Sequence, residues 1–300
     1  MEKRILGRTG LEVTPLGFGA LELKHLDEKQ AAHLMNEVLD NGINYIDTSP
    51  DYKLSEELIG KSIAHRRHEY ILATKCGDNI QGHEPQRIWT RENLMENLEH
   101  SLKTLKTDYI DAWQMHGAMP HYFTEESKQE VIQTMLDVKK SGKVRSIGTT
   151  FRNGSKKDEL YPAGYGMVAI RELIKWEELE TMQIVYGGLT RKNELAISKA
   201  SEKGIGMIAR GVIKNYFDDY DMLYSKAKIA ELHEPGETKT EFLIRYALSH
   251  PGLSTMIVGT KDVGHMKANI KAADKGRLSE DIYAEAKRRF DSVGVTAEEM

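Results

Sequence analysis

The sequence predicts an α/β fold: a (β/α)8 TIM barrel with an N-terminal β-hairpin and an additional C-terminal helix. Strand-like and helix-like segments alternate eight times along the 300 residues, which is typical of parallel strands joined by helical crossovers. No Gly-x-Gly-x-x-Gly sequence opens the first helix, which disfavours an open nucleotide-binding sheet. No linker-like or low-complexity stretch divides the chain, so we expect a single domain over residues 1–300.

The first elements are defined by turn residues and by the spacing of apolar side chains. Gly7 and Gly10 interrupt short apolar pieces within residues 4–15 and predict the hairpin. Asp27 suits the N-cap of a first helix, whose apolar residues recur at helical spacing. Ser55 is the expected cap of the second helix.

The remaining elements follow the same alternation of short apolar runs and longer amphipathic segments. The expected strands span residues 16–19, 43–47, 71–75, 109–114, 144–147, 182–185, 205–208 and 255–258. The expected helices span residues 27–41, 55–63, 90–105, 125–140, 167–174, 193–202, 240–248, 262–273 and 279–291. Residues 210–237 form the longest segment without a regular pattern, and loops of that length are often lids.

The composition argues against several classes of function. The net charge of −4 gives no basic footprint for nucleic acid or for an anionic membrane. No run of about 18 apolar residues occurs and no secretory signal follows Met1, so we expect no membrane span. The single cysteine, Cys76, fits a reducing compartment, and we expect a cytoplasmic protein. The histidines lack metal-site spacing, so we expect no metal, and the sequence does not specify an oligomeric state.

Four ionisable side chains are expected to share one rim of the barrel. Asp47 and Lys75 end two expected strands, His116 follows a third, and Tyr52 lies in the loop after Asp47. Active sites of such barrels form at the carboxyl ends of the strands. A phenol can protonate a carbonyl oxygen when an ammonium lowers its pKa and a carboxylate holds that ammonium. An imidazole can donate a hydrogen bond to the same oxygen, so the four residues together favour catalysis over separate turn or packing roles.

These segments resemble signature sequences of the aldo-keto reductase family. The strongest matches are GINYIDTSPDY at 42–52 and LGRTGLEVTPLGFG at 6–19. Further matches are ATK at 73–75, TDYID at 107–111, GKVRSIG at 142–148 and IVGTK at 257–261. The resemblance covers nearly the whole chain in order.

The resemblance implies NADPH-dependent reduction of an aldehyde or ketone, with Tyr52 as the general acid. Lys75 and Asp47 would set the pKa of Tyr52, and His116 would orient the carbonyl. The NADP cofactor would lie across the barrel mouth, beside Gly19, Asp47, Thr150, Gln183, Arg210, Gly211, Val212, Lys214, Gly259, Thr260, Lys261, His265 and Asn269. Of these, Thr150 and Gln183 would meet the carboxamide, residues 210–214 the pyrophosphate, and Thr260, Lys261 and His265 the 2′-phosphate.

Four positions depart from the family pattern, at Phe151, Gly187, Gly211 and Ala268. None of them removes a catalytic candidate, but they leave the preference between NADP and NAD open. Two other functions remain as alternatives: a nicotinamide-using sugar epimerase or isomerase, and a cofactor-sensing regulatory subunit.

The substrate is expected to be a small carbonyl compound. Polar and aromatic residues in the expected loops suit a sugar-derived or other polar carbonyl. These residues are His121, Tyr122, Arg210, Lys214, Asn215 and Tyr216.

Overall fold

The computed structural model describes residues 1–299 except 81, 83–86, 152–164 and 215–218. Eight parallel strands close into a barrel: β3 (Leu16–Gly19), β4 (Tyr45–Asp47), β5 (Ile71–Cys76), β6 (Ile110–His116), β7 (Val144–Thr150), β8 (Thr181–Val185), β9 (Gly206–Arg210) and β10 (Leu253–Val258). Each strand pairs with the next along the chain, and β10 pairs with β3 to complete the ring. The predicted (β/α)8 barrel is therefore confirmed.

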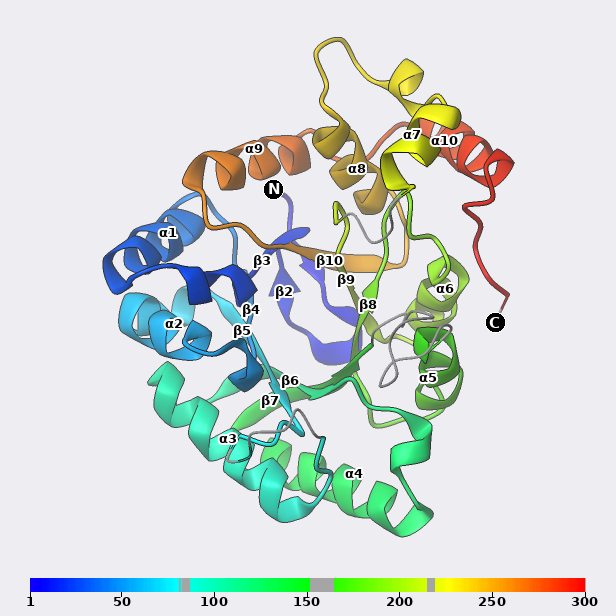
Figure 1. The fold of residues 1–300 in the computed structure, drawn as a ribbon. Helices are drawn as coiled ribbons and strands as arrows, with labels where there is room; N and C mark the ends of the chain where they lie inside the picture. Colours follow the sequence, from blue (N-terminus) through cyan, green and yellow to red (C-terminus); the bar gives the residue numbers. More distant parts are fainter. Residues whose placement is uncertain (81, 83–86, 152–164, 215–218, 300) are drawn as a thin grey trace.

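Helices surround the barrel, as Figure 1 shows. They are α1 (Glu28–Asp40), α2 (Ser55–Ile63), α3 (Arg91–Leu105), α4 (Glu125–Lys140), α5 (Tyr165–Leu173), α6 (Glu194–Glu202), α7 (Tyr220–Lys226), α8 (Lys239–Leu248), α9 (Val263–Asp274) and the additional α10 (Glu280–Ser292). Asp27 caps α1 as predicted, because its carboxylate accepts the backbone N–H of Gln30 at 2.8 Å. Ser55 does not cap α2: Leu54 occupies the cap position, and the Ser55 hydroxyl donates to the Ala20 carbonyl at 2.9 Å.

Four predicted strands were too short by two or three residues at one end: β6, β7 and β9 end later than predicted, and β10 begins earlier. One predicted loop contains a helix. β6 and β7 continue to His116 and Thr150, whose Cα atoms are partners in the parallel ladder. The segment 210–237 includes α7 and a 3-10 turn at Ile229–Leu232. Of the loop residues expected to meet the substrate, Asn215 and Tyr216 lie outside the described residues.

The N-terminal hairpin closes the amino end of the barrel. Its strands β1 (Arg4–Ile5) and β2 (Glu12–Val13) pair antiparallel, as predicted, and lie within the ring of strands in Figure 1. The hairpin side chains pack against inward-facing residues of four barrel strands. This buried cluster consists of Leu6, Leu11, Val13, Tyr45, Ala73, Ala112 and Ile208. The opposite, carboxyl end of the strands carries the predicted site residues Asp47, Lys75 and His116.

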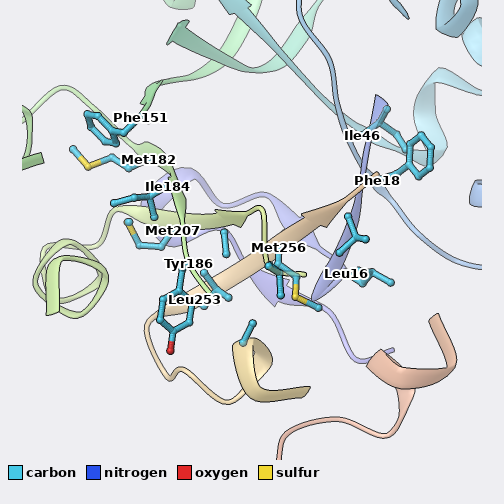
Figure 2. Packing of buried hydrophobic residues seen from close by; sticks show 14 of the residues in the cluster. Leu16, Phe18, Ile46, Phe151, Met182, Ile184, Tyr186, Met207, Leu253 and Met256 are labelled. Carbon is cyan, nitrogen blue, oxygen red and sulfur yellow. The ribbon is translucent and has the colours of Figure 1, made fainter. Parts of the chain in front are cut away.

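The main apolar core lies between the strands and the surrounding helices. Alternate side chains point outward along each strand. Figure 2 shows this layer, with Met182 and Ile184 of β8 beside Met207 of β9, and with Tyr186 just beyond β8. Among the described residues, no helix combines the length and apolarity needed to cross a bilayer.

Candidate active site

Asp47 and Lys75 form a buried ion pair at the carboxyl ends of β4 and β5. The Lys75 ammonium donates to both Asp47 oxygens at 2.8 Å each and to the Thr48 carbonyl at 2.7 Å. Gln183, on the far side of the barrel, donates from Nε2 to Asp47 Oδ2 at 2.7 Å. Burial acts to lower the pKa of Lys75, but Asp47, Tyr52 and Asp78 together outweigh burial and the net pKa is raised. Lys75 is therefore a fixed positive charge.

Tyr52 lies against this pair. It ends a 3-10 turn, Pro50–Tyr52, that begins where the Ser49 hydroxyl accepts the backbone N–H of Asp51 at 3.2 Å. The Lys75 Nζ atom stands 5.4 Å from the centroid of the Tyr52 ring. We expected Lys75 to lower the pKa of Tyr52, but burial raises it by more than Lys75 lowers it. Tyr52 is therefore held in its protonated form.

His116 completes the predicted group of four. Its ring meets the Tyr52 ring edge-on, with centroids 6.1 Å apart. On its other side, His116 Nδ1 lies 3.0 and 3.1 Å from the two oxygens of Asp78 and 3.4 Å from the Ser49 hydroxyl. Serine, histidine and aspartate thus meet here, but serine and aspartate share Nδ1, whereas a hydrolytic triad uses both ring nitrogens.

Asp78 is a site residue that the sequence reasoning missed. It follows β5 by two residues. The guanidinium of Arg87, in the same loop, donates a hydrogen bond to the Asp78 carboxylate and forms an ion pair with it. Asn97 of α3 fixes its backbone, accepting from the Asp78 N–H and donating to the Asp78 carbonyl, both at 3.0 Å. A polar residue just past a strand end, as at Asp47, was the signal that could have identified it.

One group of potential metal ligands occurs among the described residues. Oxygen and nitrogen atoms of Asp51, Asp78 and His116 lie within 4.8 Å of one another. The Arg87 guanidinium pairs with Asp78 and stands 3.6 Å from Asp51, so a protein cation already neutralises the cluster. The geometry fits a structural arginine, and the absence of a metal stays a prediction.

The residues expected to meet the nicotinamide carboxamide lie on neighbouring strands. Thr150 and Gln183 are Cα partners in the ladder between β7 and β8, and Thr150 Oγ1 accepts the Gly117 N–H at 3.1 Å. Arg210 ends β9 and donates to the Phe151 carbonyl from Nη2 at 2.7 Å. The departure at Phe151 therefore places a buried ring and a carbonyl acceptor for Arg210 at this rim.

Two further departures lie where backbones approach closely. A Cβ atom at Gly187 would lie 2.5 Å from the Val212 carbonyl oxygen, so the turn after β8 accepts only glycine while residue 212 stays in place. Gly211 has φ +66°, a left-handed conformation that glycine adopts without strain. The Lys214 N–H donates to the Gly211 carbonyl at 3.2 Å and closes the turn after β9.

The remaining cofactor candidates lie around the start of α9. A Cβ atom at Gly259 would be 2.7 Å from the Gly19 carbonyl oxygen, which brings the ends of β10 and β3 together. The side chains of Lys261 and His265 are exposed nearby. Asp262 caps α9 by accepting the His265 N–H at 2.7 Å. Its carboxylate takes up part of the helix N-terminus that we expected to hold an anion, so the fit to a phosphate rests on the side chains of Lys261 and His265.

Thr260 and Asn269, the other two cofactor candidates in this region, lie on either side of Lys261 and His265 in the sequence. Thr260 Oγ1 accepts the Asp262 N–H at 3.1 Å, which orders the turn into α9. Asn269 is buried on α9, and the departing residue Ala268 beside it is exposed. Most of the expected cofactor positions therefore lie near the carboxyl ends of the strands or in the turns that follow them, whereas Asn269 lies in the second turn of α9.

Comparison with known proteins gives consistent relatives along nearly the full chain. The model of the aldo/keto reductase family matches residues 15–288. The chain is 27% identical over 305 residues to the uncharacterized oxidoreductase YqkF of Bacillus subtilis (strain 168), covering 94% of both chains. It is 29% identical over 289 residues to L-galactose dehydrogenase of Arabidopsis thaliana, covering 91% of this chain and 88% of that one.

A solved structure agrees with these relatives. The holo form of the aldo-keto reductase AKR11C1 from Bacillus halodurans matches with a TM-score of 0.82 and 27% identity, covering 96% of each chain. The family match, the closed barrel and the four polar residues at its carboxyl end agree. The chain belongs to the aldo/keto reductase family.

Proposed function

We propose that this protein reduces an aldehyde or ketone to the alcohol with NADPH, using Tyr52 as the proton donor. Family membership makes it an oxidoreductase that works with a nicotinamide cofactor on a small carbonyl compound. The observation that carries the finer proposal is the contact of Tyr52 with the buried Lys75–Asp47 pair, because a charge held beside the phenol can stabilise its phenolate.

The proton step follows from the chemistry of this chain's residues. When bound, the nicotinamide would supply hydride to the carbonyl carbon. Tyr52 gives its hydroxyl proton to the oxygen, and the phenolate that remains is stabilised by the Lys75 ammonium. Asp47 keeps Lys75 in place, and Gln183 keeps Asp47 in place. A raised Tyr52 pKa suits this direction of reaction, because the acid enters each cycle protonated.

The cofactor preference is proposed from charge. Lys261 and His265 offer cationic or hydrogen-bonding side chains to a 2′-phosphate at the start of α9. Thr150 and Gln183 would hold the carboxamide end. Gly19, Gly259 and the turn at 211–214 would let the backbone approach the middle of the cofactor.

A polar, sugar-derived carbonyl is the proposed substrate. Arg210 brings a positive charge to the rim close to Tyr52, and His121 stacks edge-on with Tyr122 in the loop after β6. The similarity to an L-galactose dehydrogenase supports the same class. We also propose a single-domain, cytoplasmic protein, to which the buried free thiol of Cys76 is suited.

Loss of reduced-nicotinamide absorbance tests the proposal directly. NADPH and, separately, NADH are mixed with the protein and a panel of sugar aldehydes, aromatic aldehydes and ketones. Saturable oxidation with a preference for NADPH is the expected result. Substrate conversion without net cofactor oxidation would favour the epimerase alternative. Cofactor binding without turnover would favour the regulatory subunit.

A further inference from the structure

Residues Tyr52, Lys53, Leu54 and Ser55 form a type II′ turn between the 3-10 turn Pro50–Tyr52 and α2. Lys53 has φ +54° and ψ −116°, and Leu54 has φ −79° and ψ 2°. These angles lie close to the values of about +60°, −120°, −80° and 0° that define the two central positions of such a turn. The first central position is normally glycine, because a Cβ atom there crowds the backbone. In this chain it holds a lysine.

The turn is held at both ends, so the backbone of Lys53 cannot relax. At its start, the Tyr52 N–H donates to the Ser49 carbonyl at 3.0 Å. At its end, the Ser55 hydroxyl donates to the Ala20 carbonyl at 2.9 Å. Residues in such conformations persist only where their surroundings fix the chain in this way. The backbone therefore favours glycine at this position, and what the lysine adds is its side chain.

Two further lysines among the described residues have a positive φ, but both lie in the left-handed helical region. Lys106 has φ 55° and ψ 50°, and Lys228 has φ 52° and ψ 36°. That region is a small allowed one for residues with a Cβ atom, whereas a ψ of −116° lies outside it. Lys53 therefore has the least favourable backbone conformation of the three lysines.

Lys53 is an exposed cation in the loop after β4, one residue from the proposed proton donor. Within the described part of the chain, its side chain has no hydrogen bond or ion pair. The acidic residue nearest to it in sequence, Asp51, lies 3.6 Å from Arg87 instead. Arg210 also brings a positive charge close to Tyr52, but we expect it to meet the pyrophosphate of the cofactor. The charge of Lys53 is thus left for the substrate.

We propose that Lys53 is a specificity-determining residue whose ammonium binds a carboxylate carried by the carbonyl substrate. The inference deepens the proposed carbonyl reduction and rests on it, because it makes the substrate an oxo acid. Tyr52 takes the carbonyl oxygen, and Lys53 takes the carboxylate at the other end of the same molecule.

The reach and the charge of Lys53 both suit such a substrate. Adjacent Cα atoms are about 3.8 Å apart, and the flexible four-carbon stem lets the ammonium follow a group that lies a few bonds from the carbonyl. One unpaired ammonium balances one negative charge. It therefore matches a carboxylate better than a phosphate monoester, whose charge at neutral pH is about −1.5 to −2.

Matched substrates measure the selection. 4-Oxobutanoate and its methyl ester carry the same aldehyde, but only the first has a negative charge. With NADPH as the reductant, we expect kcat/KM for the acid to exceed that for the ester by about tenfold, the effect of one charge-assisted hydrogen bond. Equal values for the pair in the wild-type protein would overturn the proposal.

Lys53→Met tests whether the preference comes from this side chain. The substitution removes the charge and leaves a Cβ atom at the same position in the turn, so the preference for the acid should fall to near one. Lys53→Arg restores a cation and should restore the preference. Lys106→Met is the matched control, because it removes a lysine with a positive φ at the end of α3, near the amino end of the barrel. It should keep the wild-type preference, whereas an unchanged preference in Lys53→Met would contradict the assignment.

A stability measurement separates this inference from the proposed reaction. Lys53→Gly should raise the midpoint of urea denaturation, because glycine suits the turn, and should lose the preference for the acid. Lys106→Gly should raise the midpoint by less, since its backbone is in an allowed region. A lower midpoint in Lys53→Gly would refute the argument from the turn whether or not the protein reduces carbonyls. A raised midpoint without NADPH oxidation for any aldehyde would instead place the failure in the proposed function.

Discussion

Lys75 donates hydrogen bonds to both oxygens of Asp47 inside the barrel, where each side chain is only 1% exposed. Removing the carboxylate charge leaves an ammonium buried without its partner, which typically costs about 3–5 kcal/mol. We therefore expect Asp47→Asn to lower the free energy of unfolding by about that amount, measured by urea denaturation. Glu172→Gln breaks the exposed pair with Lys175 and serves as the control, for which no comparable loss is expected. Similar losses of unfolding free energy in both variants would mean that the buried pair stabilises the fold no more than the exposed pair does.

Tyr52→Phe should abolish carbonyl reduction while the protein still binds cofactor. The substitution removes only the hydroxyl that is proposed to protonate the substrate, and general acids typically contribute about 10²–10⁴-fold to the rate. Turnover is followed by NADPH absorbance, and cofactor binding by protein fluorescence. Turnover equal to that of the wild type would remove Tyr52 from the mechanism.

Glu56 makes the stability of the fold depend on pH. It is buried between Thr74 and Ser101, whose hydroxyls donate to it at 2.5 and 2.9 Å, and burial raises its pKa from 4.5 to about 7. Between these values the folded protein holds a proton that the unfolded chain has lost. The associated stabilisation of about 3 kcal/mol is present below pH 4.5 and disappears as the pH rises through 7.

Glu56→Gln isolates this contribution. Because glutamine cannot ionise, the difference in unfolding free energy between pH 5 and pH 8 should shrink by roughly 3 kcal/mol relative to the wild type. Other titrating groups are the same in both proteins and cancel. Parallel stability curves for the two proteins over this range would contradict the raised pKa of Glu56.

Gly77→Ala should disturb the loop that carries Asp78. Gly77 has φ +91°, and a Cβ atom there would lie 2.4 Å from the Trp89 ring. Gly142 also has a positive φ, +82°, but a Cβ atom there meets nothing within 4 Å. Gly142→Ala thus carries only the backbone cost of about 1 kcal/mol. Gly77→Ala should destabilise the protein by more than this and shift the Trp89 fluorescence, whereas equal effects would mean that Trp89 moves aside freely.

Lys261→Ala should weaken NADPH more than NADH. The proposed contact of Lys261 is with the 2′-phosphate, which NADH lacks, so we expect KM for NADPH to rise about tenfold while KM for NADH changes little. Lys267 lies on α9, which begins just after Lys261, but pairs with Glu37 at 2.7 Å, which makes Lys267→Ala a matched control. Equal rises in KM for NADPH and NADH would mean that Lys261 does not contact the 2′-phosphate.

The fold and part of the candidate site could be predicted because their signals are local. Period-two and period-3.6 patterns identify strands and helices, and the polar residues Asp47, Lys75 and His116 stand where strands end. The contact between Asp78 and His116 joins residues 38 positions apart, through a loop whose sequence resembles any polar turn. The helix α7 is only seven residues long, and no side-chain hydrogen bond caps it at Asp219, so its sequence carried few helix signals.

The closure of the barrel has a consequence for the order in which the molecule is made. β3, near the start of the chain, pairs with β10, near its end, and Thr255 Oγ1 donates across that seam to the Thr14 carbonyl at 2.8 Å. A nascent chain that has not yet emerged past residue 258 therefore carries two unpaired strand edges, on β3 and β9. Synthesis must reach β10 before the sheet can protect itself, and until then these edges are the places where a chaperone or another nascent chain would bind.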